Sequence, residues 1–223
     1  MPVAPRLYRS YRWSPYKKVI NIEEAGSGYG GAKPYTEPNR SFEDTQGVED
    51  KHAYWATQAS YGATADPKYH NKLLAAGYKL DTEPYGDRYK VYYNSKGAIL
   101  ANRGTVITDF QDLQADAGIA FGDYDSRGFQ ESYSVAKRVK AKYKNVHHTG
   151  HSLGGTKAIR NSQRMGDRAT VFNPGTSALG LNAGDKKVYT SSGDIISNRV
   201  LGTNVTRTPS KQHTLSQYDA MFQ

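Results

Sequence analysis

The chain has 223 residues and carries 30 Lys and Arg against 21 Asp and Glu, a formal net charge of +9. This length suits one larger domain with a substantial buried core. No apolar run approaches the roughly 18 residues of a membrane-spanning helix. The chain has no cysteine, which excludes disulfides, thiol nucleophiles and Cys-ligated zinc.

Residues 1–47 combine scattered prolines with a glycine-rich stretch at 26–31, a composition that predicts an irregular arm. Its first part contains cations but no acid; the cations are Arg6, Arg9, Arg12, Lys17 and Lys18. Aromatic residues between these cations suit base stacking with phosphate contact, and equally suit docking onto another protein. We therefore expect a basic arm over 1–47 and one domain over 48–223.

The N-terminus has no apolar stretch of the kind found in secretory signals, so we expect no such signal. A cytoplasmic and a virion-associated location both stay open. The basic arm also leaves open that the protein belongs to a larger assembly.

Two helices are predicted after the arm, over residues 48–63 and 67–78, from the spacing of their apolar residues. Pro67 lies in the first turn of the second helix and Gly77 near its end, as helix entry and exit favour. Strands and helices then alternate. A strand at 89–94, a turn and a strand at 98–101 precede a helix at 128–144.

Three more short strands follow, and a helix beginning near Leu153 separates the first two. These strands are predicted at 146–149, 170–172 and 187–190. Strands that alternate with helices predict an α/β fold, with a mostly parallel sheet covered on both faces.

The segment Gly150-His-Ser-Leu-Gly154 lies between a predicted strand and the helix after it. A serine nucleophile in that setting occupies a tight turn, and the positions two before and two after it leave no room for a side chain. Gly150 and Gly154 meet this requirement, and the helix start favours negative charge. The pentapeptide alone is a modest signal, but its context predicts that Ser152 is a nucleophile.

A serine nucleophile needs a base to take its proton and an acid to orient that base. His213 is the only histidine after Ser152, and we predict that it is the base. Asp194 follows a predicted strand at the sheet edge where ligand sites gather, which favours it as the acid. Asp185 precedes that strand, and Asp167 is expected on the surface. A turn aspartate and a surface histidine are the structural alternatives for Asp194 and His213.

Histidines 147, 148 and 151 crowd this motif. His147 and His148 are neighbours on a strand, so their side chains should point to opposite faces. The chain also lacks cysteine and an HExxH pattern. We expect no metal and no other cofactor, and we expect His151 to pack beside the turn.

A second basic cluster spans residues 137–168, where Asp167 is the only acid. Charge runs of this kind are usually solvated faces. The alternative is attraction to a polyanion, such as nucleic acid, anionic lipid headgroups or an acidic partner.

Five pieces of the chain, in order, carry a resemblance to one family. They are Ala98–Thr105 followed by Asp109–Leu113, Arg127–Phe129, Thr149–Gly155, Asp194–Ile196 and His213–Tyr218. They resemble the class 3 lipases, the fungal triacylglycerol lipase group of α/β-hydrolases, from about residue 89 to 220. The resemblance implies an α/β-hydrolase fold, with Ser152, Asp194 and His213 as the catalytic triad. It also implies an oxyanion hole formed by Thr105 and Leu153.

The chain departs from the family at several places. Val171–Gly175 and Asp194–Arg199 replace family patterns, and Phe110 stands where a Trp is usual. The segment after Thr105 is short and polar, so we expect no long amphipathic lid. These departures bear on the substrate and on interfacial activation more than on catalysis.

The leading hypothesis is therefore a serine-dependent carboxylic ester hydrolase acting on lipid acyl esters, like a lipase or phospholipase A1. The positive charge favours an anionic membrane substrate over neutral fat. The alternative is a lipase-like domain that serves as a binding or structural protein, for example in a virus particle, with the arm contacting nucleic acid or a neighbouring subunit. Acyl transfer and peptide hydrolysis use the same residues and stay open.

Overall fold

The computed structural model describes residues 48–105, 127–177 and 179–223. The chain divides into residues 1–43 and 44–223, and all described residues belong to the second unit. The predicted basic arm lies outside the described residues. So do the Asp109–Leu113 stretch with Phe110 and the segment expected to lack a lid.

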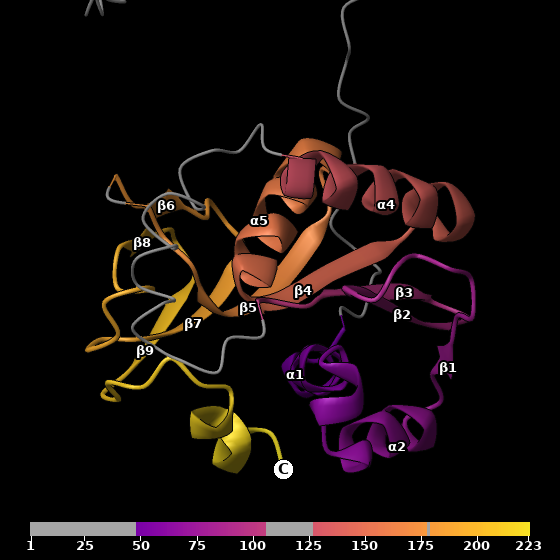
Figure 1. The fold of residues 1–223 in the computed structure, drawn as a ribbon, viewed down its shortest axis with the longest axis horizontal. Coiled ribbons are helices and arrows are strands. Elements are labelled where there is room, and N and C mark those ends of the chain that lie inside the picture. Colours follow the sequence, from indigo (N-terminus) through magenta and orange to yellow (C-terminus); the bar gives the residue numbers. More distant parts are fainter. Residues whose placement is uncertain (1–47, 106–126, 178) are drawn as a thin grey trace, which may run out of the picture. The chain divides into compact units, whose positions relative to one another are not determined.

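The described strands form a seven-stranded sheet in the order β1-β2-β3-β4-β5-β7-β9 (Figure 1). The pairs β1·β2 and β2·β3 are antiparallel, and every pair from β3 to β9 is parallel. The strands are β1 (Lys79–Leu80), β2 (Tyr89–Asn94), β3 (Gly97–Asn102), β4 (Val146–Ser152), β5 (Arg168–Pro174), β7 (Lys187–Ser191) and β9 (Val205–Thr208). A separate parallel pair joins β6 (Leu181–Asn182) to β8 (Val200–Leu201).

Helices cover both faces of the sheet (Figure 1). One face carries α1 (Asp50–Ala59) and α2 (Pro67–Ala75), and the other carries α4 (Arg127–Tyr143) and α5 (Leu153–Met165). Short 3-10 turns occur at η2 (Gly62–Thr64) and η3 (Ser216–Met221). The predicted α/β fold with a mostly parallel central sheet is confirmed.

Local chemistry explains the bounds of α2. The carboxylate of Asp66 accepts a hydrogen bond from the backbone N–H of Lys68 at 2.9 Å, and Pro67 occupies the first turn. Gly77 lies just past the helix at a φ of 86°, a conformation that favours glycine. The predicted helix at 67–78 therefore ends three residues early, at Ala75.

The central strands are apolar on both sides because both faces are covered. On β3, Ile99 and Ala101 join the cluster that includes α1 and α2. Leu100 points the other way and joins the cluster that contains Val135 and Val139 of α4. This alternation fits a strand buried between two helical layers.

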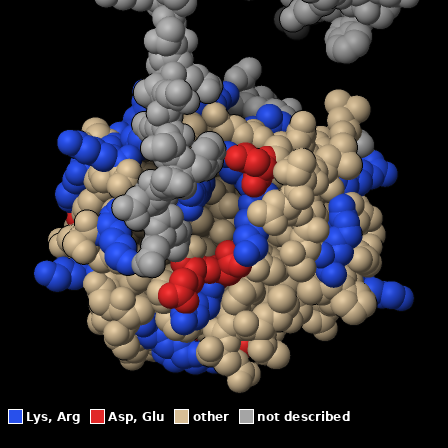
Figure 2. All heavy atoms as spheres, turned by 180° about the vertical axis from the view of Figure 1, so that it is seen from behind, with Lys and Arg blue, Asp and Glu red and all other residues tan. Residues whose placement is uncertain are grey.

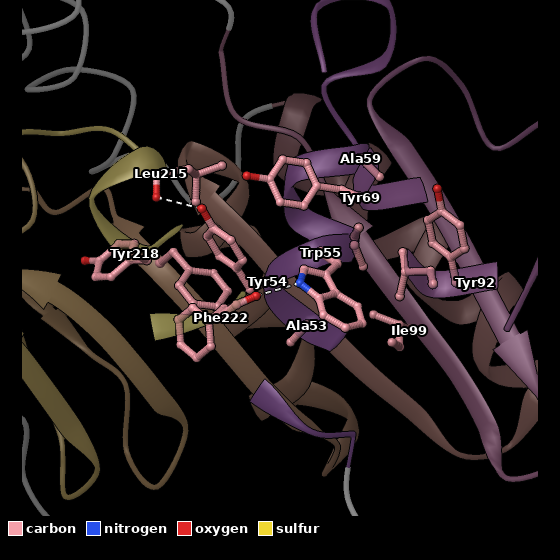
Figure 3. Packing of buried hydrophobic residues seen from close by; sticks show 14 of the residues in the cluster. Ala53, Tyr54, Trp55, Ala59, Tyr69, Tyr92, Ile99, Leu215, Tyr218 and Phe222 are labelled. Atoms are coloured by element: carbon pink, nitrogen blue, oxygen red, sulfur yellow. Dashed lines mark hydrogen bonds between the residues drawn. The ribbon is translucent and has the colours of Figure 1, made fainter. Parts of the chain in front are cut away.

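The segment that follows β9 is attached to α1 (Figure 3). The Tyr54 hydroxyl donates to the carbonyl of Leu215 at 2.9 Å, and the Trp55 indole N–H donates to the carbonyl of Phe222 at 2.8 Å. The Phe222 ring packs against the rings of Tyr54 and Tyr189. His213 lies two residues before Leu215, so these contacts fix the segment that carries it.

The sequence did not reveal the two-residue strands, β9 or η3. Two residues cannot display a periodicity, and β9 is an edge strand of half-buried and exposed residues. The predicted helix at 48–63 is α1 followed by η2. None of the helices in the described part of the chain is long and apolar enough to cross a bilayer.

Candidate active site

Ser152 occupies a strained turn between β4 and α5. Its φ of 55° and ψ of −130° are unusual for a residue with a side chain and cost on the order of 1–3 kcal/mol. A Cβ on Gly150 would lie 2.6 Å from the carbonyl carbon of Gly154, and one on Gly154 would collide with the carbonyl oxygen of Asn102. Both predicted glycines are therefore required where the turn presses against the end of β3.

His213 and Asp194 form a buried pair. The Nδ1 atom of His213 lies 2.5 Å from Oδ2 of Asp194, and the two residues are only 6% and 1% exposed. The backbone N–H of Ile196 donates to Oδ1 at 3.0 Å, and the Ser197 hydroxyl donates to Oδ2 at 2.5 Å. These bonds fix the carboxylate so that it accepts the proton on Nδ1. In the neutral ring, Nε2 is then a proton acceptor.

The structure gathers the three predicted residues at one edge of the sheet. Ser152 ends β4, Asp194 follows β7, and His213 follows β9. These strands are parallel, so their carboxyl ends share the edge at which α/β folds place ligand sites. The burial of His213 rules out a surface histidine. Asp194 does lie in a turn, where its backbone N–H donates to the carbonyl of Ser191 at 3.3 Å, but it is buried there and pairs with His213.

Ser152 Oγ and His213 Nε2 are both buried without a hydrogen-bond partner. The structure therefore contains no hydrogen bond between them. Nε2 of His151, the residue before Ser152, also lacks a partner. Buried polar atoms normally have partners, so three such atoms at one sheet edge need an explanation. Serine–base hydrogen bonds are often long in ligand-free structures and tighten when substrate binds.

The predicted oxyanion residues flank Ser152. A Cβ on Gly104 would lie 3.2 Å from the Cβ of Ser152, so the chain that leaves β3 passes directly over the serine. Thr105 is the next residue and is exposed. Leu153 begins α5, where backbone N–H groups have no partner within the helix.

Tyr61 is a member of the site that sequence reasoning missed. Its hydroxyl lies 2.7 Å from Nδ1 of His151, whose ring centroid is 4.9 Å from that of His213. Burial and the neighbouring His213 hold the pKa of His151 well below its usual range. Ninety positions separate Tyr61 from His151, so no local pattern marks the pair. His151 packs beside the turn, as expected.

The prediction that Asp167 lies on the surface is wrong. It is 6% exposed, and its Oδ2 lies 3.2 Å from Nε2 of the fully buried His148. It also pairs with Lys140 of α4. Gly166 explains the difference, because its left-handed conformation ends α5 and turns the chain inward.

The two strand histidines have different partners. His147 Nε2 lies 3.0 Å from the Thr170 hydroxyl, whereas His148 contacts Asp167. Burial lowers the pKa of His147 to about 3. Within the described ranges, no group of three or more His, Asp or Glu side chains is arranged to hold a metal.

Lys157 belongs to the basic cluster of residues 137–168, but it is buried and not on a solvated face. It is 3% exposed, and its ammonium lies 5.9 Å from the centroid of the Phe129 ring. Burial lowers the pKa of Lys157.

No protein-family model matches the chain, and no curated protein matches it in sequence. The resemblance to class 3 lipases rests on the five sequence segments that carry it.

Proposed function

We propose that the protein is a serine-dependent carboxylic ester hydrolase of the α/β-hydrolase type, similar to class 3 lipases. The observation that carries the proposal is the buried His213–Asp194 pair at the same sheet edge as the strained Ser152. An orphaned serine hydroxyl and an orphaned imidazole nitrogen at that edge are the two atoms that nucleophilic catalysis brings together.

In the proposed reaction, Ser152 Oγ attacks the ester carbonyl while His213 Nε2 takes the hydroxyl proton. His213 then gives this proton to the leaving alcohol, and an acyl-serine remains. Asp194 holds the ring tautomer and stabilises the imidazolium. Water, activated by His213, releases the carboxylic acid and restores the serine.

The oxyanion would be stabilised by backbone N–H groups of Leu153 and Thr105, with the Thr105 hydroxyl as a further donor. A donor set in place before the reaction contributes about 3 kcal/mol to lowering the barrier. The position of Gly104 against Ser152 supports this role for the residue that follows it.

Lipid acyl esters are the proposed substrates. The motif resemblance supports this class, and two exposed apolar side chains fit it. Leu179 is 98% exposed in the loop after β5, and Ile195 is 59% exposed directly after Asp194. Both loops leave the sheet at the edge that carries Ser152, where they would meet an acyl chain or a lipid surface.

Labelling with a fluorophosphonate tests the proposal, because this reagent modifies only an activated serine. Intact-mass measurement should show one adduct on the folded protein, and peptide mapping should place it on Ser152. Ser152→Ala and His213→Ala should both abolish it. Ser192→Ala, at an exposed serine in the loop after β7, is the matched control and should label normally. Folded wild-type protein that takes no label would overturn the proposal.

A further inference from the structure

The outer faces of α4 and α5 form a strongly basic surface. Between Arg127 and Met165 the described helices contain one acid on α4, Glu131, and none on α5. We call five of its exposed cations the helical basic face. They are Lys137, Arg138 and Lys142 in the second half of α4, Lys144 directly after it, and Arg164 near the end of α5. Figure 2 shows that Lys and Arg outnumber Asp and Glu on the side of the molecule that it displays.

Part of this charge is balanced. Arg138 pairs with Glu83, and Lys142 pairs with Asp81 and Glu83. For Lys137, Lys144 and Arg164, the described residues supply no carboxylate partner. Within the described part of the chain, no carboxylate neutralises these three cations, so their charge can attract an anion.

Two of these cations converge on one aromatic ring. The ammonium of Lys137 and the guanidinium of Arg164 each lie 5.1 Å from the centroid of Tyr133. The ring attracts each cation by only about 0.5–1 kcal/mol at an exposed site, and the two like charges repel each other. A bound anion would relieve this repulsion, so the arrangement suits closely spaced phosphates.

The face lacks what a membrane-binding surface needs. Surfaces that lie on a bilayer combine cations with exposed apolar side chains. In the described part of the chain, the large apolar residues that are exposed belong to other elements: Leu74, Leu179, Ile195, Leu201 and Met221. The helical basic face has none of them.

The face is also far from the proposed ester site along α5. Leu153 begins this helix beside Ser152, whereas Arg164 is its penultimate residue. At 1.5 Å per residue, about 17 Å of helix separate the two ends. A bilayer held by Arg164 and Lys137 would not place its esters at Ser152, so substrate binding does not explain these charges.

We propose that the helical basic face binds the sugar–phosphate backbone of a nucleic acid. Lys137, Arg164 and Lys144 would contact phosphates. The ring of Tyr133 would hold the side chains of Lys137 and Arg164 in place through its cation–π contacts. Contacts to phosphate carry no sequence information, so binding should be independent of sequence and should weaken steeply with salt.

Fluorescence anisotropy of the full chain with a labelled duplex DNA, over a salt series, tests this proposal. Lys137→Glu combined with Arg164→Glu should weaken binding roughly tenfold and reduce the slope of log affinity against log salt by about 2. The matched control is Lys79→Glu combined with Lys211→Glu. It changes the net charge of the protein by the same amount, at exposed positions outside the face. It should retain nearly all of the affinity and the slope.

The outcomes separate the alternatives. Equal losses in the two double variants would show a general charge effect and overturn the proposal, as would wild-type protein that does not bind. Vesicles of phosphatidylglycerol and phosphatidylcholine form a second arm of the experiment. Tighter binding to vesicles than to DNA, lost in the Lys137 and Arg164 variant, would assign the face to membranes instead. Thermal melts of both variants close to that of the wild type would show that each is folded.

Discussion

The rings of His151 and His213 lie 4.9 Å apart, and their planes are inclined by 37°. His151 precedes Ser152, and its Nδ1 is fixed by Tyr61. In the proposed reaction His213 becomes positively charged, so a neutral neighbour is preferable to a charged one. The depressed pKa of His151 keeps that ring neutral.

Replacing Tyr61 tests whether this contact positions His213. Tyr61→Phe leaves the buried Nδ1 of His151 without its partner, which should cost about 1–3 kcal/mol of unfolding free energy in urea titrations. The rate of fluorophosphonate labelling should also fall. Tyr92→Phe is the control, because Tyr92 bonds His70 at 3.0 Å on another part of the domain. A labelling rate that falls equally in both variants would show that Tyr61 has no specific role.

Glycine-to-alanine substitutions at Gly150, beside the Ser152 turn, and at Gly128, on α4, should have opposite effects on stability. Gly150→Ala would place a Cβ 2.6 Å from Gly154 and 2.7 Å from the Asn102 carbonyl, which should destabilise the protein by roughly 1–3 kcal/mol or more. Gly128→Ala on α4 meets only the flexible end of Lys157 at 3.5 Å, and it should stabilise the helix by up to about 1 kcal/mol. Thermal melts of both variants would check the contrast. Equal melting temperatures would contradict it.

Buried His147 should make the protein sensitive to acid. Burial lowers its folded-state pKa to about 3, whereas its unfolded value is 6.5. Below pH 6.5 the unfolded chain binds the proton and the folded chain does not, so stability falls as pH drops towards 3. The loss from this residue should reach about 2–3 kcal/mol near pH 4.5.

Urea titrations at a series of pH values would measure this loss. His147→Asn removes the titrating group and should flatten the dependence between about pH 6.5 and 4.5. An unchanged slope in the variant would show that other groups cause the acid sensitivity.

Because η3 and the residues around it pack on α1, a loss of packing there should affect the position of His213 in the candidate site. Phe222→Ala should cost roughly 3–5 kcal/mol and loosen the segment that carries His213. At temperatures well below the melting temperature of the variant, where it is still folded, the labelling of Ser152 should then be slower than in the wild type. Leu73→Ala, at a fully buried position on α2, is the control for lost core packing. It should destabilise the protein while labelling stays close to normal.

Much of the arrangement follows from the sequence. The short strands that alternate with helices predict the parallel sheet, and chain order then places Ser152, Asp194 and His213 at its carboxyl edge. Tyr61 could not be found in this way, because tertiary packing brings the turn after α1 to His151 of β4 across ninety positions. Asp167 was placed wrongly for a similar reason, since its partner His148 lies on a neighbouring strand.

The contact between Trp55 and Phe222 has a consequence for synthesis. It joins residues 167 positions apart, and with Tyr54 it fixes the segment that carries His213. On a ribosome, Ser152 and its strained turn emerge well before that segment. Most of the sheet can therefore form while His213 is still held in place by nothing, and His213 is fixed beside the other candidate site residues only after Phe222 has left the exit tunnel.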